Sequence, residues 1–151
     1  MRRIMFGWVF AGGILLVGSI YDIKSYSLPW WLVVLGLLGG VAGGSYFLIS
    51  GEGDWREVLT GLLPGGLAIG LAFFSKEQIG YGDGLILWML GGCVGTQSTV
   101  GILMIGLFTS FVVSIVLLMV RKAGRDTKIP FVPCLLLGYF VFGLGGLMNA
   151  F

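Results

Sequence analysis

Long uninterrupted runs of apolar residues constrain this chain more than any other feature of its sequence. One of them, residues 100–120, contains no charged side chain. In a lipid bilayer every backbone polar group must be satisfied within the protein, so only helices and closed barrels span it. A barrel strand alternates apolar and polar residues, whereas unbroken runs indicate helices. Of the 151 residues, 57% are hydrophobic and 11% charged, against roughly a quarter charged in a soluble domain.

Short polar breaks divide the chain into six apolar segments. They predict an all-α, polytopic transmembrane helix bundle of about six spans, forming a single domain over residues 1–151. The expected spans are residues 4–21, 30–50, 58–74, 84–94, 99–120 and 131–151. The fourth span is shorter than the roughly 20 residues that a full crossing needs. Pro64, followed by two glycines, is expected to kink the third span.

The positions of lysine and arginine predict an orientation, because cytoplasmic loops carry an excess of both. The breaks after the first, third and fifth spans contain Lys24, Lys76, Arg121, Lys122, Arg125 and Lys128. The other side contains Arg2, Arg3 and Arg56. We therefore expect a multi-pass protein of the cytoplasmic (inner) membrane with these three breaks in the cytoplasm, although Arg2 and Arg3 favour the opposite orientation. The net charge of +2, without a basic and aromatic cluster, indicates no nucleic-acid partner.

Glycine accounts for 28 residues, and several glycines recur at a spacing of four. The stripes contain Gly36, Gly40 and Gly44 in the second span, and Gly61, Gly65, Gly66 and Gly70 in the third. Small residues at this spacing allow helix backbones to approach closely in lipid. We interpret the stripes as packing surfaces within the chain, with a homodimer through the glycine stripes as the alternative.

The composition also excludes several kinds of chemistry. The chain has no histidine, which removes most zinc, haem and serine–histidine mechanisms. Its two cysteines, Cys93 and Cys134, stand alone in apolar runs and form no CxxC pair. We therefore expect no metal and no cofactor.

Two aspartates stand out among the few ionisable residues. Asp22 ends the first span, where a carboxylate opposes the helix dipole. Asp83 begins the fourth span, where an aspartate is a good N-cap. Either residue alone could be a solvated boundary residue, and Asp22 could pair with Lys24. An even number of crossings separates the two aspartates, so both lie on the same membrane face in either orientation.

Two carboxylates at one depth in a bundle of low dielectric constant can share a proton, because like charges resist ionising together. One carboxylate then activates a water molecule, and the protonated one polarises a peptide carbonyl. This chemistry hydrolyses a peptide without metal or histidine. Glycines on both sides of Asp83 would let an extended peptide approach the backbone.

Three segments carry a resemblance to a known family. Residues 80–83 read GYGD and match the GxGD motif of intramembrane aspartyl proteases. Asp22 precedes Pro29 by seven residues, and residues 129–138 read IPFVPCLLLG. In this order the segments resemble the two aspartate motifs and the late PFxPxLxxG segment of the type IV prepilin leader peptidases. The chain differs from the family pattern at Leu85, where lysine is common, and at Trp30, where asparagine is common.

The resemblance implies an aspartic endopeptidase that cleaves the basic leader of type IV prepilins or pseudopilins at the cytoplasmic membrane face. Asp22 and Asp83 would be the catalytic pair. The residues expected to bind substrate or shape the site are Gly80, Gly82, Gly84, Lys24, Pro29, Glu77, Pro130 and Pro133. Without a CxxC-containing insertion, the chain resembles the short form of the family, which lacks the N-methyltransferase domain.

The expected partners are the prepilin leader, the apolar helix that follows it and the lipid bilayer. The acidic pair and Glu77 would attract the basic leader, whereas the basic break after the fifth span would repel it. Two other functions stay open at this point. One is a small proton-coupled transporter in which both aspartates carry protons. The other is a catalytically inactive membrane assembly protein in which both are boundary residues.

Overall fold

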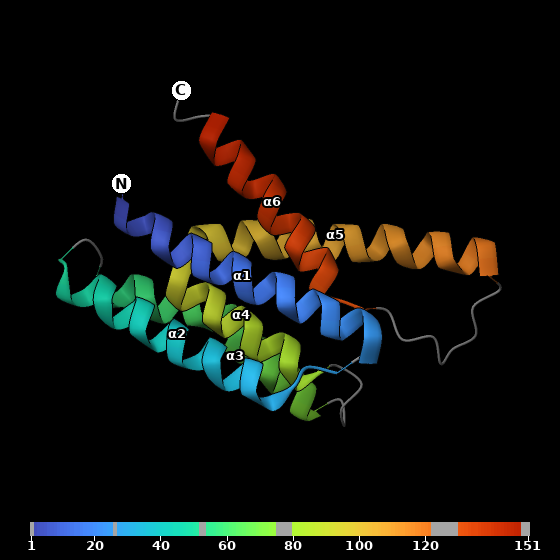
Figure 1. The fold of residues 1–151 in the computed structure, drawn as a ribbon, viewed down its shortest axis with the longest axis horizontal. Coiled ribbons are helices and arrows are strands. Elements are labelled where there is room, and N and C mark those ends of the chain that lie inside the picture. The colour runs from blue at the N-terminus through green and yellow to red at the C-terminus, as the bar shows by residue number, and fades with distance from the viewer. Residues whose placement is uncertain (1, 26, 52–53, 75–79, 122–129, 149–151) are drawn as a thin grey trace.

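The computed structural model describes residues 2–25, 27–51, 54–74, 80–121 and 130–148, and these form a bundle of six α-helices without a strand (Figure 1). The helices are α1 (Arg2–Ser25), α2 (Trp30–Ile49), α3 (Trp55–Phe74), α4 (Tyr81–Val94), α5 (Thr96–Arg121) and α6 (Val132–Met148). The predicted all-α membrane bundle is confirmed. Four helices, α1, α2, α3 and α5, are long and apolar enough to cross a membrane, and α4 and α6 are shorter.

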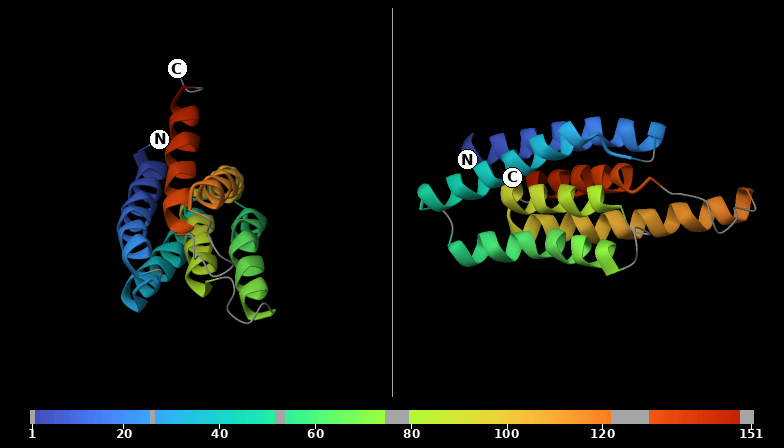
Figure 2. Two further views of the ribbon diagram at one scale, coloured as in Figure 1. Left: turned by 90° about the vertical axis from the view of Figure 1, so that its right-hand side faces the viewer. Right: turned by 90° about the horizontal axis from the view of Figure 1, so that it is seen from below.

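Helix α4 is the central element, surrounded by α1, α2, α3 and α5 (Figure 2). Its 14 residues extend only about 21 Å, against a hydrocarbon core of about 30 Å. Half of its residues are buried, including Met89 and Leu90, which are fully enclosed. The short fourth span of the sequence is therefore an internal helix whose neighbours, rather than lipid, form its environment.

Glycines bring the backbones of α2 and α3 into direct contact with α4. A Cβ atom on Gly40 of α2 would lie 2.9 Å from the Cα atom of Met89. A Cβ atom on Gly61 of α3 would lie 2.8 Å from the carbonyl oxygen of Gly91. Real Cβ atoms do not approach other atoms so closely, so any larger residue would force the helices apart.

The contacts of several stripe glycines support the interpretation of packing within the chain. Gly36 and Gly40 of α2 face Met89, and Gly65 of α3 lies against the backbone of Trp88. At these positions the stripes are packing surfaces within the chain, whereas a Cβ atom on Gly70 of α3 would meet no described neighbour from the rest of the bundle within 4 Å, and the homodimer stays a prediction.

Several helix boundaries differ from the sequence prediction. Helix α1 continues to Ser25, so Asp22 lies inside the helix and not in the break after it. The expected connection of residues 95–98 reduces to Gly95, whose φ of 81° is readily adopted by glycine, and α5 begins at Thr96. Helix α3 runs continuously through Pro64.

The end of α1 and the starts of α2, α4 and α6 lie at one end of the bundle (Figure 1).

We predict that Gly91→Ala lowers the free energy of unfolding by about 1–3 kcal/mol. The added methyl group would collide with the carbonyl oxygen of Gly61. Thermal unfolding in detergent measures the effect. Gly70→Ala is the matched control, because no described atom from the rest of the bundle lies within 4 Å of its added methyl group. Equal unfolding temperatures for the two variants would contradict the role assigned to glycine packing.

Candidate active site

Asp22 lies in the last turn of α1 and is nearly enclosed, with 8% of its surface exposed. A charged side chain at the C-terminal end of a helix meets the negative end of the helix dipole, so this position alone is unfavourable for a carboxylate. A buried charge requires compensation from hydrogen bonds or from an opposite charge. The compensation comes from a distant part of the chain.

The N-terminus of α6 supplies that compensation. The backbone N–H of Val132, the first residue of α6, donates a hydrogen bond of 3.0 Å to Oδ2 of Asp22. The backbone N–H of Phe131 donates to the same carboxylate. The first N–H groups of a helix have no partner within the helix, and the positive end of its dipole favours an anion. Asp22 therefore acts as an N-terminal cap for α6 from another helix.

Asp83 lies in the first turn of α4 and is half-buried. The prediction that Asp83 is the N-cap is wrong, because Gly80 occupies that position and Asp83 follows three residues later. The N–H of Asp83 donates a 3.1 Å hydrogen bond to the carbonyl oxygen of Gly80. Asp83 therefore belongs to the helical turn itself, and its side chain starts from the rigid central helix.

The fold brings Asp22 and Asp83 together at one end of the bundle. Their carboxylates are near enough to interact electrostatically, although 61 residues separate them in the chain. Within the described ranges, no group of three or more histidine, cysteine, aspartate or glutamate side chains gathers that could hold a metal ion. Among the described residues, the two interacting carboxylates are the groups that could carry out acid–base chemistry here.

The glycines around Asp83 accommodate other parts of the same chain. A Cβ atom on Gly82 would lie 2.6 Å from Cδ1 of Leu28, and one on Gly84 would lie 2.9 Å from the backbone nitrogen of Ile69. These contacts assign Gly82 and Gly84 to internal packing, which differs from the expected approach of a peptide. Gly80 lies next to the carboxylate of Asp83, since a Cβ atom there would be 3.4 Å from Oδ2.

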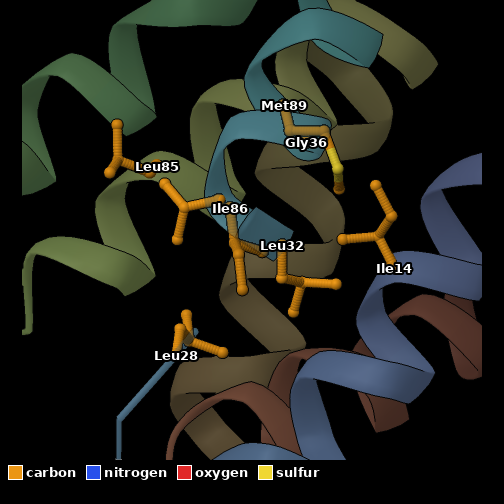
Figure 3. Close-up of a pocket in the computed structure, with 8 residues that line it drawn as sticks. Ile14, Leu28, Leu32, Gly36, Leu85, Ile86 and Met89 are labelled. Atoms are coloured by element: carbon orange, nitrogen blue, oxygen red, sulfur yellow. The ribbon is translucent and has the colours of Figure 1, made fainter. Parts of the chain in front are cut away.

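An apolar pocket lies beside this site, between α1, α2 and α4 (Figure 3). Figure 3 shows Leu28, Leu32 and Ile86 pointing into it, with Ile14 on the α1 side. Its free volume is about 10 Å³, which is at most the room that one water molecule needs. The pocket is therefore a packed seam that fixes the connection before α2 against the helix that carries Asp83.

The remaining predicted site residues have mainly local roles. Pro29 precedes α2, and its carbonyl oxygen accepts a 3.0 Å hydrogen bond from the N–H of Leu32. Pro130 and Pro133 flank the two N–H groups that bind Asp22. Lys24 is exposed on α1, and Glu77 lies outside the described residues.

Sequence reasoning missed the backbone donors of Phe131 and Val132 and the contact of Leu28 with Gly82. Backbone N–H groups have no signature of their own in a sequence. The two prolines of the late segment were the available signal, because proline is common in the first turn of a helix and helix starts bind anions.

The fold and the site define a helical membrane protein with two interacting aspartates at one end of its bundle. The sequence pattern of the type IV leader peptidase family matches residues 9–119, which shows that this chain belongs to that family. The predicted family is thereby confirmed.

Three relatives are each named prepilin leader peptidase/N-methyltransferase. The one from Pectobacterium carotovorum subsp. carotovorum is 29% identical over 91% of this chain and 49% of its own length. The one from Stutzerimonas stutzeri is 32% identical over 87% of this chain and 47% of its own length. The one from Myxococcus xanthus is 27% identical over 85% of this chain and 41% of its own length. The chain thus spans about half the length of these relatives or less, and no solved structure matches it.

We predict that Asp22→Ala loosens the start of α6 and lowers the free energy of unfolding by about 1–2 kcal/mol, the usual cost of losing a helix cap. Amide hydrogen exchange at Val132 and the unfolding temperature measure the two effects. Asp83→Ala is the control, because it removes a like charge and no cap. If both variants left the exchange at Val132 unchanged, the capping role of Asp22 would be wrong.

Proposed function

We propose that this chain is a membrane-embedded aspartic endopeptidase that cleaves the leader peptide of type IV prepilins or prepilin-like proteins. The observation that carries the proposal is the meeting of Asp22 on α1 with Asp83 on α4 at one end of the bundle. Membership of the type IV leader peptidase family and the names of the three relatives support it.

The proposed reaction needs only the two carboxylates and water. The ionised carboxylate takes a proton from a water molecule, whose oxygen attacks the carbonyl carbon of the scissile peptide bond. The protonated carboxyl group gives its proton to the carbonyl oxygen, which forms a neutral gem-diol. When the C–N bond breaks, one carboxyl group protonates the leaving amine and the other recovers the hydroxyl proton. The bundle around the pair strengthens these electrostatic interactions by limiting water.

The position of the pair suits a bond at the edge of the membrane. Asp22 and Asp83 lie at the ends of their helices, and four long apolar helices continue from this level through the bundle. A substrate with an apolar helix after its basic leader would place its scissile bond at the same level. The lysine and arginine distribution supports the cytoplasmic face of the inner membrane for this end of the bundle.

The interior of the bundle favours a peptidase over a proton-coupled transporter. Fully buried apolar side chains, among them Leu15, Met89, Leu90, Ile102 and Leu135, form its core. Helix α2 contains no charged residue, and α5 contains only Arg121, at its end. A proton path starting at Asp22 and Asp83 would have no acidic or basic side chain to continue it through α2 or through α5 before Arg121.

We predict that the purified protein in detergent removes the leader of a prepilin from its own host, seen as a mobility shift on a gel. Asp22→Asn and Asp83→Asn should each lower the cleavage rate at least 10³-fold, since each removes a reacting group. Asp54→Asn is the matched control, because Asp54 is exposed just before α3. Normal cleavage by either active-site variant would exclude that aspartate from the reaction. Absence of cleavage by the unsubstituted protein on several prepilins would favour the assembly function.

We also predict that exchanging the basic residues of the leader for glutamate raises the KM roughly tenfold at low salt, through repulsion from the acidic pair. The difference in KM between the two prepilins should diminish as the salt concentration rises, because salt screens the interaction. Steady-state cleavage of the two prepilins at several ionic strengths tests this expectation. A KM that is independent of leader charge would show that the acidic pair does not attract the leader.

A further inference from the structure

The two carboxylates of the site are held in different ways. Asp22 accepts hydrogen bonds from two backbone N–H groups at the start of α6, those of Phe131 and Val132. A carboxylate that accepts backbone N–H bonds is stabilised in its charged form, and such charge-assisted bonds are about twice as strong as neutral ones. A protonated carboxyl group would lose most of this stabilisation.

Asp83 has a different environment. It also lies near the N-terminus of a helix, α4, so the helix dipole acts on both aspartates. Within the part of the chain that the structure describes, however, no N–H donates to its carboxylate, and the neighbouring carboxylate of Asp22 carries a like charge. Gly82 and Gly84 beside it contribute no polar side chain.

We propose that Asp22 is the ionised general base of the pair and Asp83 the protonated acid, because the first N–H groups of α6 donate to Asp22 alone. The inference deepens the proposed function, and it rests on that function for the catalytic roles of base and acid. The underlying difference in protonation is independent of any substrate. Val132 is then a positioning residue that acts through its backbone.

The prolines of residues 130–133 help to explain why the start of α6 is suited to binding the Asp22 carboxylate. Pro133 has no N–H, so the second position of α6 contributes no further donor. The N–H of Cys134 already bonds to the carbonyl oxygen of Phe131 at 3.0 Å. The free donors at this helix start are therefore those of Phe131 and Val132, the two that bind Asp22.

Among the residues that the structure describes, the other ionisable groups near Asp22 are few. Asp83 of α4 and the thiol of Cys134 on α6 both interact with it electrostatically. Helix α2, which also contacts α1, carries no charged residue, and its tyrosine, Tyr46, lies near its far end. On α1 itself Lys24 is exposed. Neither Asp83 nor Cys134 offers a positive charge, so among the described groups near Asp22 the N–H groups of α6 are the main stabilisation of its anion.

The first test measures protonation without a substrate. In Asp83→Asn the remaining carboxyl group of the pair is Asp22, and in Asp22→Asn it is Asp83. Infrared spectroscopy follows the band of the protonated carboxyl group of each variant as the pH is changed. The carboxyl group of Asp22 should ionise at a lower pH than that of Asp83. The reverse order, or equal values, would overturn the assignment.

The second test changes the donors. Val132→Pro removes the N–H that binds Asp22 at a helix position where proline is tolerated, so ionisation of Asp22 in the Asp83→Asn background should move up by roughly one pH unit. Val132→Ala keeps the N–H and loses only side-chain packing, so it should not move the ionisation. Pro133→Ala adds an N–H and should lower the pH at which Asp22 ionises. If Val132→Pro and Pro133→Ala both left the pH at which Asp22 ionises unchanged, α6 would not control the protonation of Asp22.

The pH dependence of prepilin cleavage connects these states to the reaction. With both aspartates present, Val132→Pro should move the acidic limb of the kcat/KM profile to higher pH, and Pro133→Ala should move it to lower pH. A shift confined to the basic limb would assign the base to Asp83. If the unsubstituted protein cleaved no prepilin, the proposed function would fail, while the infrared titrations would still decide which aspartate is ionised.

Discussion

The close backbone contact of α4 with its neighbours is the constraint on which the rest of the structure depends. A helix of 14 residues is too short to span the hydrocarbon core alone, so α4 is enclosed by longer helices. Lipid supplies no hydrophobic driving force between helices, and close packing at small residues takes its place. Gly40 and Gly61 allow that packing from opposite sides. The result is a rigid central helix that presents Asp83 at one end.

The second long-range interaction joins Asp22 to the start of α6, across 110 residues of sequence. Asp22 is unfavourably placed with respect to the dipole of its own helix, and α6 has N–H groups without partners. Each feature compensates the other. The hydroxyl of Tyr139 on α6 also donates to the carbonyl oxygen of Trp8 on α1, which fixes the same pair of helices further along. Docking of α6 is thus coupled to the geometry of the site.

These two interactions give the carboxylates unlike surroundings, and acid–base catalysis by a pair of carboxyl groups requires unlike protonation states. Asp22 is held by backbone donors, while Asp83 projects from the central helix among glycines that accommodate Leu28 and Ile69. In the proposed reaction, this difference in surroundings gives two chemically identical side chains different roles in a chain that has no histidine.

The sequence by itself determined the helical membrane class, the six helices of the described residues and the two aspartates of interest. Apolar runs report directly on helices in lipid, and the parity of crossings places Asp22 and Asp83 on one face whatever the orientation. Tertiary structure decided that α1 extends past Asp22, that Gly80 rather than Asp83 is the N-cap of α4, and that Gly40, Gly61 and Gly65 pack against α4. It also decided which N–H groups bind Asp22. Such contacts join backbone atoms of distant segments, and the pattern of side chains along a chain does not encode them locally.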